Sequence, residues 1–184
     1  MDALQASAVR RNVELKARLR DPGGARRLAV ELSGGPPQVL RQTDTYYRCP
    51  RGRLKLRQFA GGSAELIAYS RANEHAPRLS RYHLVPVTDA GQLHQALSAA
   101  LGVLIVVKKV RELSLYKNVR IHIDEVDRLG AFVEFEAVLE SQAHDAEGEP
   151  LVRELSARFG LESGDLIAES YSDMLLRAGE NTSD

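Results

Sequence analysis

The sequence predicts an α+β domain built around a closed or nearly closed antiparallel barrel of eight β-strands with flanking helices. Two observations support this prediction: about eight short segments have the residue pattern of strands, and turn sequences join most of them as hairpins. A third is that helical segments interrupt and follow the strands and need an apolar surface to cover. With 184 residues, 43% of them hydrophobic, the chain suffices for one domain spanning 1–184, with a core of about 10–176 and frayed termini.

The strand segments are rich in β-branched and aromatic residues or alternate polar and apolar residues. The predicted strands are 11–19, 38–49, 53–59, 64–72, 80–87, 103–116, 119–126 and 131–140. Short turns such as AGGS before the fourth strand and Lys117-Asn118 after the sixth are typical of hairpins. Because a hairpin joins antiparallel neighbours, we expect a mostly antiparallel sheet.

Two helices are predicted between strands, at 22–33 and within 88–102. Asp21 can cap the first, Thr88 or Asp89 can cap the second, and a glycine follows each helix. After the last strand, three short helical segments are predicted to pack Leu and Ile against an apolar surface. These segments are 149–161, 164–170 and 171–178.

The composition limits the partners of the protein. Twenty-five basic residues balance 25 acidic ones, so the net charge gives no indication of a nucleic-acid or membrane partner. No apolar run reaches the ~20 residues of a membrane span, and the N-terminus lacks the apolar core of a secretory signal, so we expect a cytoplasmic protein. The single Cys49 excludes an internal disulfide, and zinc-ligand spacing does not occur, so carboxylates must hold any metal.

The charged residues of the predicted strands share one face of each strand, because successive side chains point to opposite faces. The sets that share a face are Glu14, Lys16, Arg18 and Arg20; Arg53, Lys55 and Arg57; Lys109 and Arg111; Arg120, His122 and Asp124; and Glu134 and Glu136. For any single strand, the ordinary explanation is a face in contact with water. Taken together, these faces are denser in Arg, Lys and paired acids than typical solvent faces.

If helices cover the apolar face and the sheet closes, the charged face becomes the inside of a barrel. Unpaired buried charge is very costly, so a polyanion with divalent cations is the natural filling. Guanidinium groups match phosphate oxygens in pairs, and lysines add point charges. Glu14, Glu134 and Glu136 then fit as ligands of Mg²⁺ or Mn²⁺, and internal salt bridges to Arg and Lys are the alternative.

An ordered set of segments resembles the CYTH family, the triphosphate tunnel metalloenzymes that include class IV adenylate cyclases, thiamine triphosphatases and inorganic triphosphatases. NVELK resembles the opening ExExK motif of the family at Glu14 and Lys16, with Asn12 in place of the first glutamate. The other matching segments are QTDTYY, RLKLR, KKVRELSLY, RIHIDEVDRLGAFVEFE and SYSDML. The resemblance covers almost the whole chain.

The resemblance implies a triphosphate inside the barrel, bound by basic residues and by Mg²⁺ or Mn²⁺. The implied phosphate contacts are Lys16, Lys55, Arg57, Lys109 and Arg111, with Arg53 and Arg120 as additions. The implied metal ligands are Glu14, Glu134 and Glu136, with Asp124 as an addition. Where many members carry a phosphate-binding lysine, this chain has Tyr69, and Arg71 is the expected substitute.

The expected partner is a small molecule with a triphosphate group: ATP, thiamine triphosphate or tripolyphosphate. Hydrolysis is favoured because nothing in the sequence specifies adenine, and a class IV-type adenylate cyclase that forms cyclic AMP and pyrophosphate from ATP is the second reaction that fits. A polyphosphate- or nucleotide-binding module without turnover, or a face that docks an acidic partner, is a third alternative, which Asn12 and Tyr69 support.

Three further expectations concern partners and chemistry. RNA binding is disfavoured because the chain has no Trp and only 5% aromatic residues, which leaves few stacking platforms. Exposed outer strands are compatible with a homodimer. The catalytic acid or base stays unassigned, because a strand histidine among charged neighbours, such as His122, is more often a hydrogen-bonding spacer.

Overall fold

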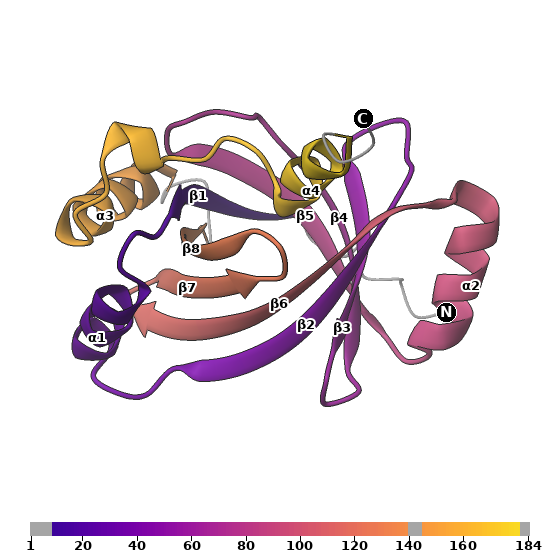
Figure 1. Cartoon of the computed structure of the whole chain (residues 1–184), viewed down its shortest axis with the longest axis horizontal. Helices are drawn as coiled ribbons and strands as arrows, with labels where there is room; N and C mark the ends of the chain where they lie inside the picture. The colour runs from indigo at the N-terminus through magenta and orange to yellow at the C-terminus, as the bar shows by residue number, and fades with distance from the viewer. Residues whose placement is uncertain (1–8, 140–144, 181–184) are drawn as a thin grey trace, which may run out of the picture.

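The computed structural model of the chain describes residues 9–139 and 145–180, which form a closed eight-stranded barrel as predicted (Figure 1). The strands are β1 (Arg10–Arg18), β2 (Gln38–Tyr47), β3 (Arg53–Phe59), β4 (Ala64–Arg71), β5 (Arg78–Val87), β6 (Val103–Tyr116), β7 (Val119–Val126) and β8 (Gly130–Leu139). Their order around the barrel is β1-β5-β4-β3-β2-β6-β7-β8, and every neighbouring pair is antiparallel. The first strand therefore closes the barrel against the last.

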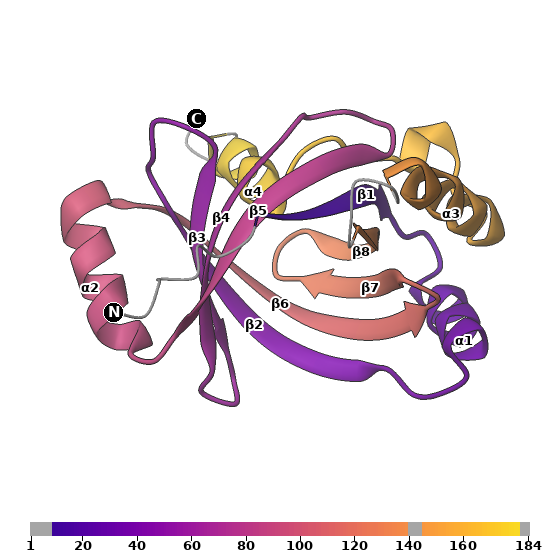
Figure 2. The same ribbon diagram turned by 180° about the vertical axis from the view of Figure 1, so that it is seen from behind.

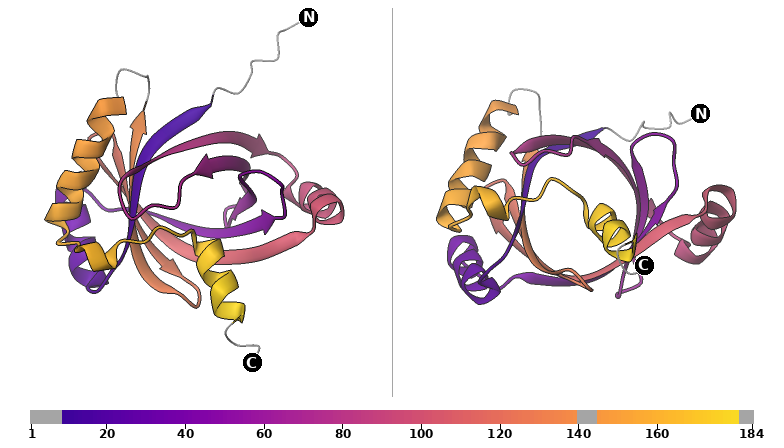
Figure 3. Two further views of the ribbon diagram at one scale, coloured as in Figure 1. Left: turned by 90° about the horizontal axis from the view of Figure 1, so that it is seen from above. Right: turned by 45° about the horizontal axis from the view of Figure 1, so that its top comes forward.

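The helices of the described residues flank this barrel. They are α1 (Pro22–Ser33), α2 (Ala90–Leu101), α3 (Asp145–Arg158) and α4 (Tyr171–Glu180), with a 3₁₀ turn at Ser163–Asp165. Figure 1 and the reverse view in Figure 2 place α1 and α3 on one side of the barrel and α2 on the other. Helix α4 and the segment before it cross one end of the barrel (Figure 3). None of these helices is long and apolar enough to cross a lipid bilayer.

The first two helices begin and end as the sequence predicts. The side chain of Asp21 accepts a hydrogen bond from the Gly24 N–H at 2.9 Å, and Asp89 accepts one from the Gln92 N–H at the same distance. Helix α1 ends at Gly34, whose φ of 71° lies in the left-handed region that a glycine adopts without a steric penalty.

The helix predicted at 164–170 is wrong. After the 3₁₀ turn the chain is extended, because its backbone pairs with the end of β1: Leu166 bridges Ala17, and the Ile167 N–H donates to the Lys16 carbonyl at 2.8 Å. This segment thus lies across the end of the barrel. The fraying predicted for the two termini falls mainly on residues 1–8 and 181–184, outside the described residues.

The apolar face of β1 packs against the helices, and its charged face points into the barrel. Val13, Leu15 and Ala17 are buried in a cluster that includes side chains of β7, β8, α1 and α3. Burial of a side chain the size of Leu15 stabilises the fold by about 1.5–3 kcal/mol. The alternating residues Glu14 and Lys16 therefore face the interior, where they are only 6% and 4% exposed.

Candidate functional site

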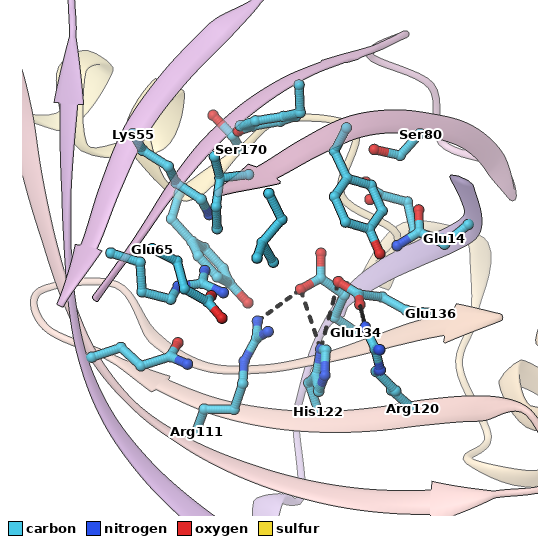
Figure 4. A pocket seen from close by; sticks show the side chains of 18 of the residues that line it. Glu14, Lys55, Glu65, Ser80, Arg111, Arg120, His122, Glu134, Glu136 and Ser170 are labelled. Carbon is cyan, nitrogen blue, oxygen red and sulfur yellow. Dashed lines mark hydrogen bonds and ion pairs between the residues drawn. The ribbon is translucent and has the colours of Figure 1, made fainter. Parts of the chain in front are cut away.

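The barrel encloses a cavity of about 360 Å³ that is lined by all eight strands and by the start of α4 (Figure 4). All but two of the site residues predicted from the sequence line it. They are Glu14, Lys16, Lys55, Arg57, Arg71, Lys109, Arg111, Arg120, Glu134 and Glu136. The alternation of the strands explains this convergence, because every strand places one face of its side chains inside the closed barrel.

One side of the cavity, on β2, β3 and β6, is positively charged. We call it the cationic wall, and it consists of Lys55, Arg57, Lys109 and Asp44. The carboxylate of Asp44, which is 1% exposed, accepts hydrogen bonds from Lys55 Nζ at 3.0 Å, Arg57 Nε at 2.8 Å and Lys109 Nζ at 2.9 Å. Three cations share one carboxylate, so this wall has excess positive charge for a ligand.

The titration of two groups in the cationic wall is strongly shifted. Burial by itself would raise the pKa of Asp44, but Arg57, Lys109 and Lys55 hold it well below its usual range. Burial, together with nearby positive charges that include Arg57 and Arg111, lowers the pKa of Lys109 to about 7 against the attraction of Asp44. Asp44 is thus ionised, and Lys109 titrates near neutral pH.

The opposite side of the cavity, on β1, β7 and β8, carries carboxylates. We call it the acidic wall, and it consists of Glu14, Glu134, Glu136 and His122. Glu134 accepts a hydrogen bond from Arg111 Nη2 at 2.8 Å and lies 3.5 Å from Lys16 Nζ. Burial alone would raise the pKa of Glu134, but Lys16, His122 and Arg111 hold it well below its usual range. Glu134 is therefore a carboxylate, able to bind a cation.

Glu14 is held differently from Glu134. Its Oε1 lies 3.0 Å from Arg71 Nε and 3.1 Å from Arg78 Nε, so two arginines form ion pairs with Glu14. Burial and the nearby charge of Glu134 raise the pKa of Glu14 despite these arginines. Arg71 lines the cavity as expected, but its Nε is directed to Glu14, and its Nη1 donates to the Ala168 carbonyl.

The part of the acidic wall on β7 and β8 fits a divalent cation. His122, Glu134 and Glu136 each offer one ligand atom, and these atoms lie within 4.8 Å of one another. His122 Nδ1 is buried, lies 3.8 Å from a carboxylate oxygen of each glutamate and has no hydrogen-bond partner among the described residues. Carboxylates and imidazole nitrogen are common ligands of divalent metals, so the donor set suits the metal that the CYTH resemblance implies.

Two predicted residues are not brought to the cavity wall. Arg53 begins β3 at the end of the barrel near α4, where its Nη2 donates to Asp173 at 2.8 Å. Asp124 is fully buried behind Arg111, which binds both of its oxygens, and the Tyr171 hydroxyl donates to it at 2.9 Å. The structure therefore places Asp124 as the partner of Arg111 and gives Arg53 an ion pair with α4.

The sequence reasoning missed two residues that organise the walls. Asp44 stands in QTDTYY with its side chain on the inner face, and its position opposite Arg57 on the neighbouring strand was the available signal. The sequence pattern starts β5 at Ser80 and so leaves Arg78 outside the strand, whereas β5 begins at Arg78 and pairs there with Glu14. Asn12, which lines the cavity, is buried, and its Oδ1 has no partner among the described residues.

The end of the cavity away from α4 carries a group of apolar side chains, which we call the apolar mouth, beside the charged side chains of Arg10, Glu65 and Arg120. Its lining comes from the start of β2 and β4 and from the ends of β3, β5 and β6. These residues are Leu40, Phe59, Ile67, Leu84 and Leu113. Tyr82 also lines this part of the cavity, opposite Arg10 on β1. An apolar mouth next to charged walls suits a ligand that has both a charged and an organic part.

The geometry and the sequence together define the class of the protein. A CYTH-domain family model matches residues 10–171, so the chain belongs to the CYTH family. A search of curated proteins finds no significant match.

Solved structures of other proteins share this fold. One, a protein from Pyrococcus horikoshii OT3, has a TM-score of 0.75 at 20% identity, with 88% of this chain and 98% of that chain covered. A candidate adenylate cyclase from Vibrio parahaemolyticus has a TM-score of 0.69 at 20% identity, with 89% and 97% covered. A candidate adenylyl cyclase from Hippeastrum with a dominant triphosphatase activity has a TM-score of 0.58 at 15% identity, with 91% and 96% covered.

Proposed function

We propose that this CYTH protein is a metal-dependent triphosphatase that hydrolyses an organic triphosphate inside its barrel. The observation that carries the proposal is the opposition of the two walls across one cavity. The cationic wall offers excess positive charge to a phosphate chain, and the acidic wall offers carboxylates and an imidazole to a divalent cation. A triphosphate with Mg²⁺ or Mn²⁺ is the ligand that complements both walls.

The residues of the chain supply binding and orientation in this proposal. Lys55 and Arg57 bind phosphate oxygens from one side, while Asp44 holds both side chains in place. Arg111, which reaches Glu134 on the opposite wall, stabilises charge between the walls. Glu134 and Glu136 would hold the cation, and Mg²⁺ or Mn²⁺, when bound, would supply polarisation of the terminal phosphoryl group and orientation of a water molecule.

The apolar mouth favours an organic substrate over inorganic tripolyphosphate. Burial of apolar side chains such as Phe59 and Leu84 against a base or another ring would add binding energy that tripolyphosphate does not supply. Hydrolysis is supported by the Hippeastrum relative, whose dominant activity is described as triphosphatase. The same mouth could orient a nucleotide for cyclisation, so the adenylate cyclase reaction is the second candidate.

The test is phosphorus NMR of the full chain with Mg²⁺ or Mn²⁺, incubated separately with ATP, thiamine triphosphate and tripolyphosphate. We expect orthophosphate release, fastest from one of the two organic substrates. Pyrophosphate with cyclic AMP from ATP would instead assign the cyclase reaction. No turnover, together with protection against heat by tripolyphosphate, would identify a binding module, since a ligand that binds only the folded state raises its stability.

Two expectations from the sequence stay predictions beside this proposal. They are the cytoplasmic location and the homodimer. Gel filtration coupled to light scattering of the full chain would test the second.

A further inference from the structure

The imidazole of His122 lies in the acidic wall beside Glu134 and Glu136. Its side chain is 4% exposed, yet its Nδ1 makes no hydrogen bond with any described residue. A buried polar atom without a hydrogen-bond partner destabilises the folded protein, so this atom, which borders a cavity, is suited to bind a ligand. Nδ1 points to the two glutamates of β8, as Figure 4 shows, but both oxygens lie 3.8 Å away, beyond hydrogen-bond length.

The neighbouring cations leave room for a metal at this place. Arg120 Nη1 lies 3.7 Å from Oε2 of Glu136, whereas Oε1 is the oxygen nearest to His122. Arg111 occupies Oε2 of Glu134, but a carboxylate oxygen has a second lone pair. One nitrogen and two carboxylates therefore converge on one point from adjacent strands, β7 and β8, which pair His122 directly with Glu134.

We propose that His122 is a direct metal ligand through Nδ1, together with Glu134 and Glu136, and that this site selects Mn²⁺, Co²⁺ or Zn²⁺ over Mg²⁺. The inference rests on the proposed function for the two carboxylates and adds the imidazole and the resulting selectivity. Mg²⁺ strongly prefers oxygen ligands, whereas first-row transition metals also accept imidazole nitrogen, Co²⁺ and Zn²⁺ more strongly than Mn²⁺. On the neighbouring strand β1, Asn12 lines the cavity with a neutral amide, so it adds no carboxylate to this site.

The direct test is pulsed EPR of the full chain loaded with Mn²⁺ alone and then with Mn²⁺ and tripolyphosphate. An electron spin echo modulation from a histidine nitrogen is expected, and the pattern must change when the protein is labelled with ¹⁵N-histidine. This measurement requires no variant and no turnover. Mn²⁺ bound without nitrogen modulation would overturn the inference while leaving a carboxylate-bound metal and the proposed function intact.

The selectivity is tested by calorimetric titration of His122→Asn with Mn²⁺, Zn²⁺ and Mg²⁺. We expect the affinity for Mn²⁺ and Zn²⁺ to fall ~10-fold or more, because loss of a residue that only supports a metal ligand already has an effect of that size. The affinity for Mg²⁺ should stay unchanged. The control is His83→Asn, since His83 is exposed on the outer face of β5 and should bind all three metals as wild type does.

Equal losses for Mg²⁺ and Mn²⁺ in His122→Asn would contradict the selectivity. Circular dichroism of the variant identifies loss of folding, and in that event the EPR result for the wild-type chain decides alone. Failure of the wild-type chain to bind any of the three metals, with or without tripolyphosphate, would overturn this inference and the metal dependence of the proposed function together. Turnover without nitrogen modulation would overturn this inference and leave the proposed function intact.

Discussion

The two walls of the cavity differ in how their charges are balanced. In the cationic wall a single buried carboxylate, Asp44, holds three cations, so the wall is rigid and retains excess positive charge. In the acidic wall each carboxylate has its own set of partners, from two arginines at Glu14 to one distant arginine at Glu136. One wall is therefore held together by its own ion pairs, whereas part of the other carries the groups to which we assign the metal in the proposed function.

The largest effect is expected from the centre of the cationic wall. Asp44→Asn would leave three cations close together with no compensating charge, and breaking a buried ion pair in this way typically costs about 3–5 kcal/mol. Urea denaturation should show a loss of unfolding free energy in that range. Glu125→Gln, an exposed change on the outer face of β7, is the control and should stay within about 0.5 kcal/mol of wild type. Equal stabilities of the two variants would show that Asp44 does not stabilise the cationic wall.

A substitution in the acidic wall should lower activity and leave stability unchanged. Glu136→Gln removes a proposed metal ligand from a side chain that is 17% exposed and whose ion pair with Arg120 is long, at 3.7 Å, so folding should be retained. We expect metal-dependent turnover to fall by about 100-fold, while the melting temperature without metal is unchanged. Turnover at the wild-type rate in Glu136→Gln would remove Glu136 from the metal site.

A substitution at Arg57 tests whether the cationic wall binds the phosphate chain. Arg57→Ala leaves Asp44 with two lysines, so the barrel should fold. The guanidinium, which binds both oxygens of Asp44 and is proposed to bind phosphate with its remaining donors, is lost. Calorimetry with tripolyphosphate should show a loss of about 1–3 kcal/mol, the usual value for a hydrogen bond to a charged group. Arg41→Ala, on the exposed outer face of β2, is the matched control and should bind as wild type does. Wild-type affinity in Arg57→Ala would place the phosphate chain elsewhere.

The smallest effect should come from the protonation of Lys109. Since its pKa is lowered to about 7, Lys109 is charged below pH 7 and mostly neutral above it. An anionic ligand prefers the charged form, so affinity for tripolyphosphate should weaken as the pH rises through 7, and binding near pH 8 should take up a proton. Lys109→Arg keeps its charge at every pH tested and should remove this component. Identical pH profiles for the wild type and Lys109→Arg would contradict the shifted pKa.

The sequence predicts the barrel and most of its interior because both depend on the two-residue repeat of strands. Lys55 and Arg57 share a face however the sheet closes, and the same holds for Glu134 and Glu136. The boundary of β5 and the extended segment at 164–170 could not be predicted in this way, since pairing with distant parts of the chain determines both.

The individual partners inside the barrel depend on three-dimensional packing. Strand parity places Asp124 on the inner face, but Tyr171 and Arg111 bury it away from the cavity. Parity also groups Arg53 with Lys55, although Arg53 is the first residue of β3 and donates a hydrogen bond to Asp173 of α4. Parity therefore identifies which side chains face inward and does not identify which of them contact a ligand.

The closure of β1 against β8 determines when the two walls come together as the protein folds. Lys16 pairs with Glu134, so contacts in the acidic wall join segments more than a hundred positions apart. Contacts between such distant segments form slowly, because a long loop must close before they stabilise the chain. A nascent chain that has emerged only through β6 already contains the strands of the cationic wall, whereas the proposed metal site requires β8. On the proposed function, the part of the barrel that would attract a polyphosphate is therefore synthesised before the part that would bind the metal.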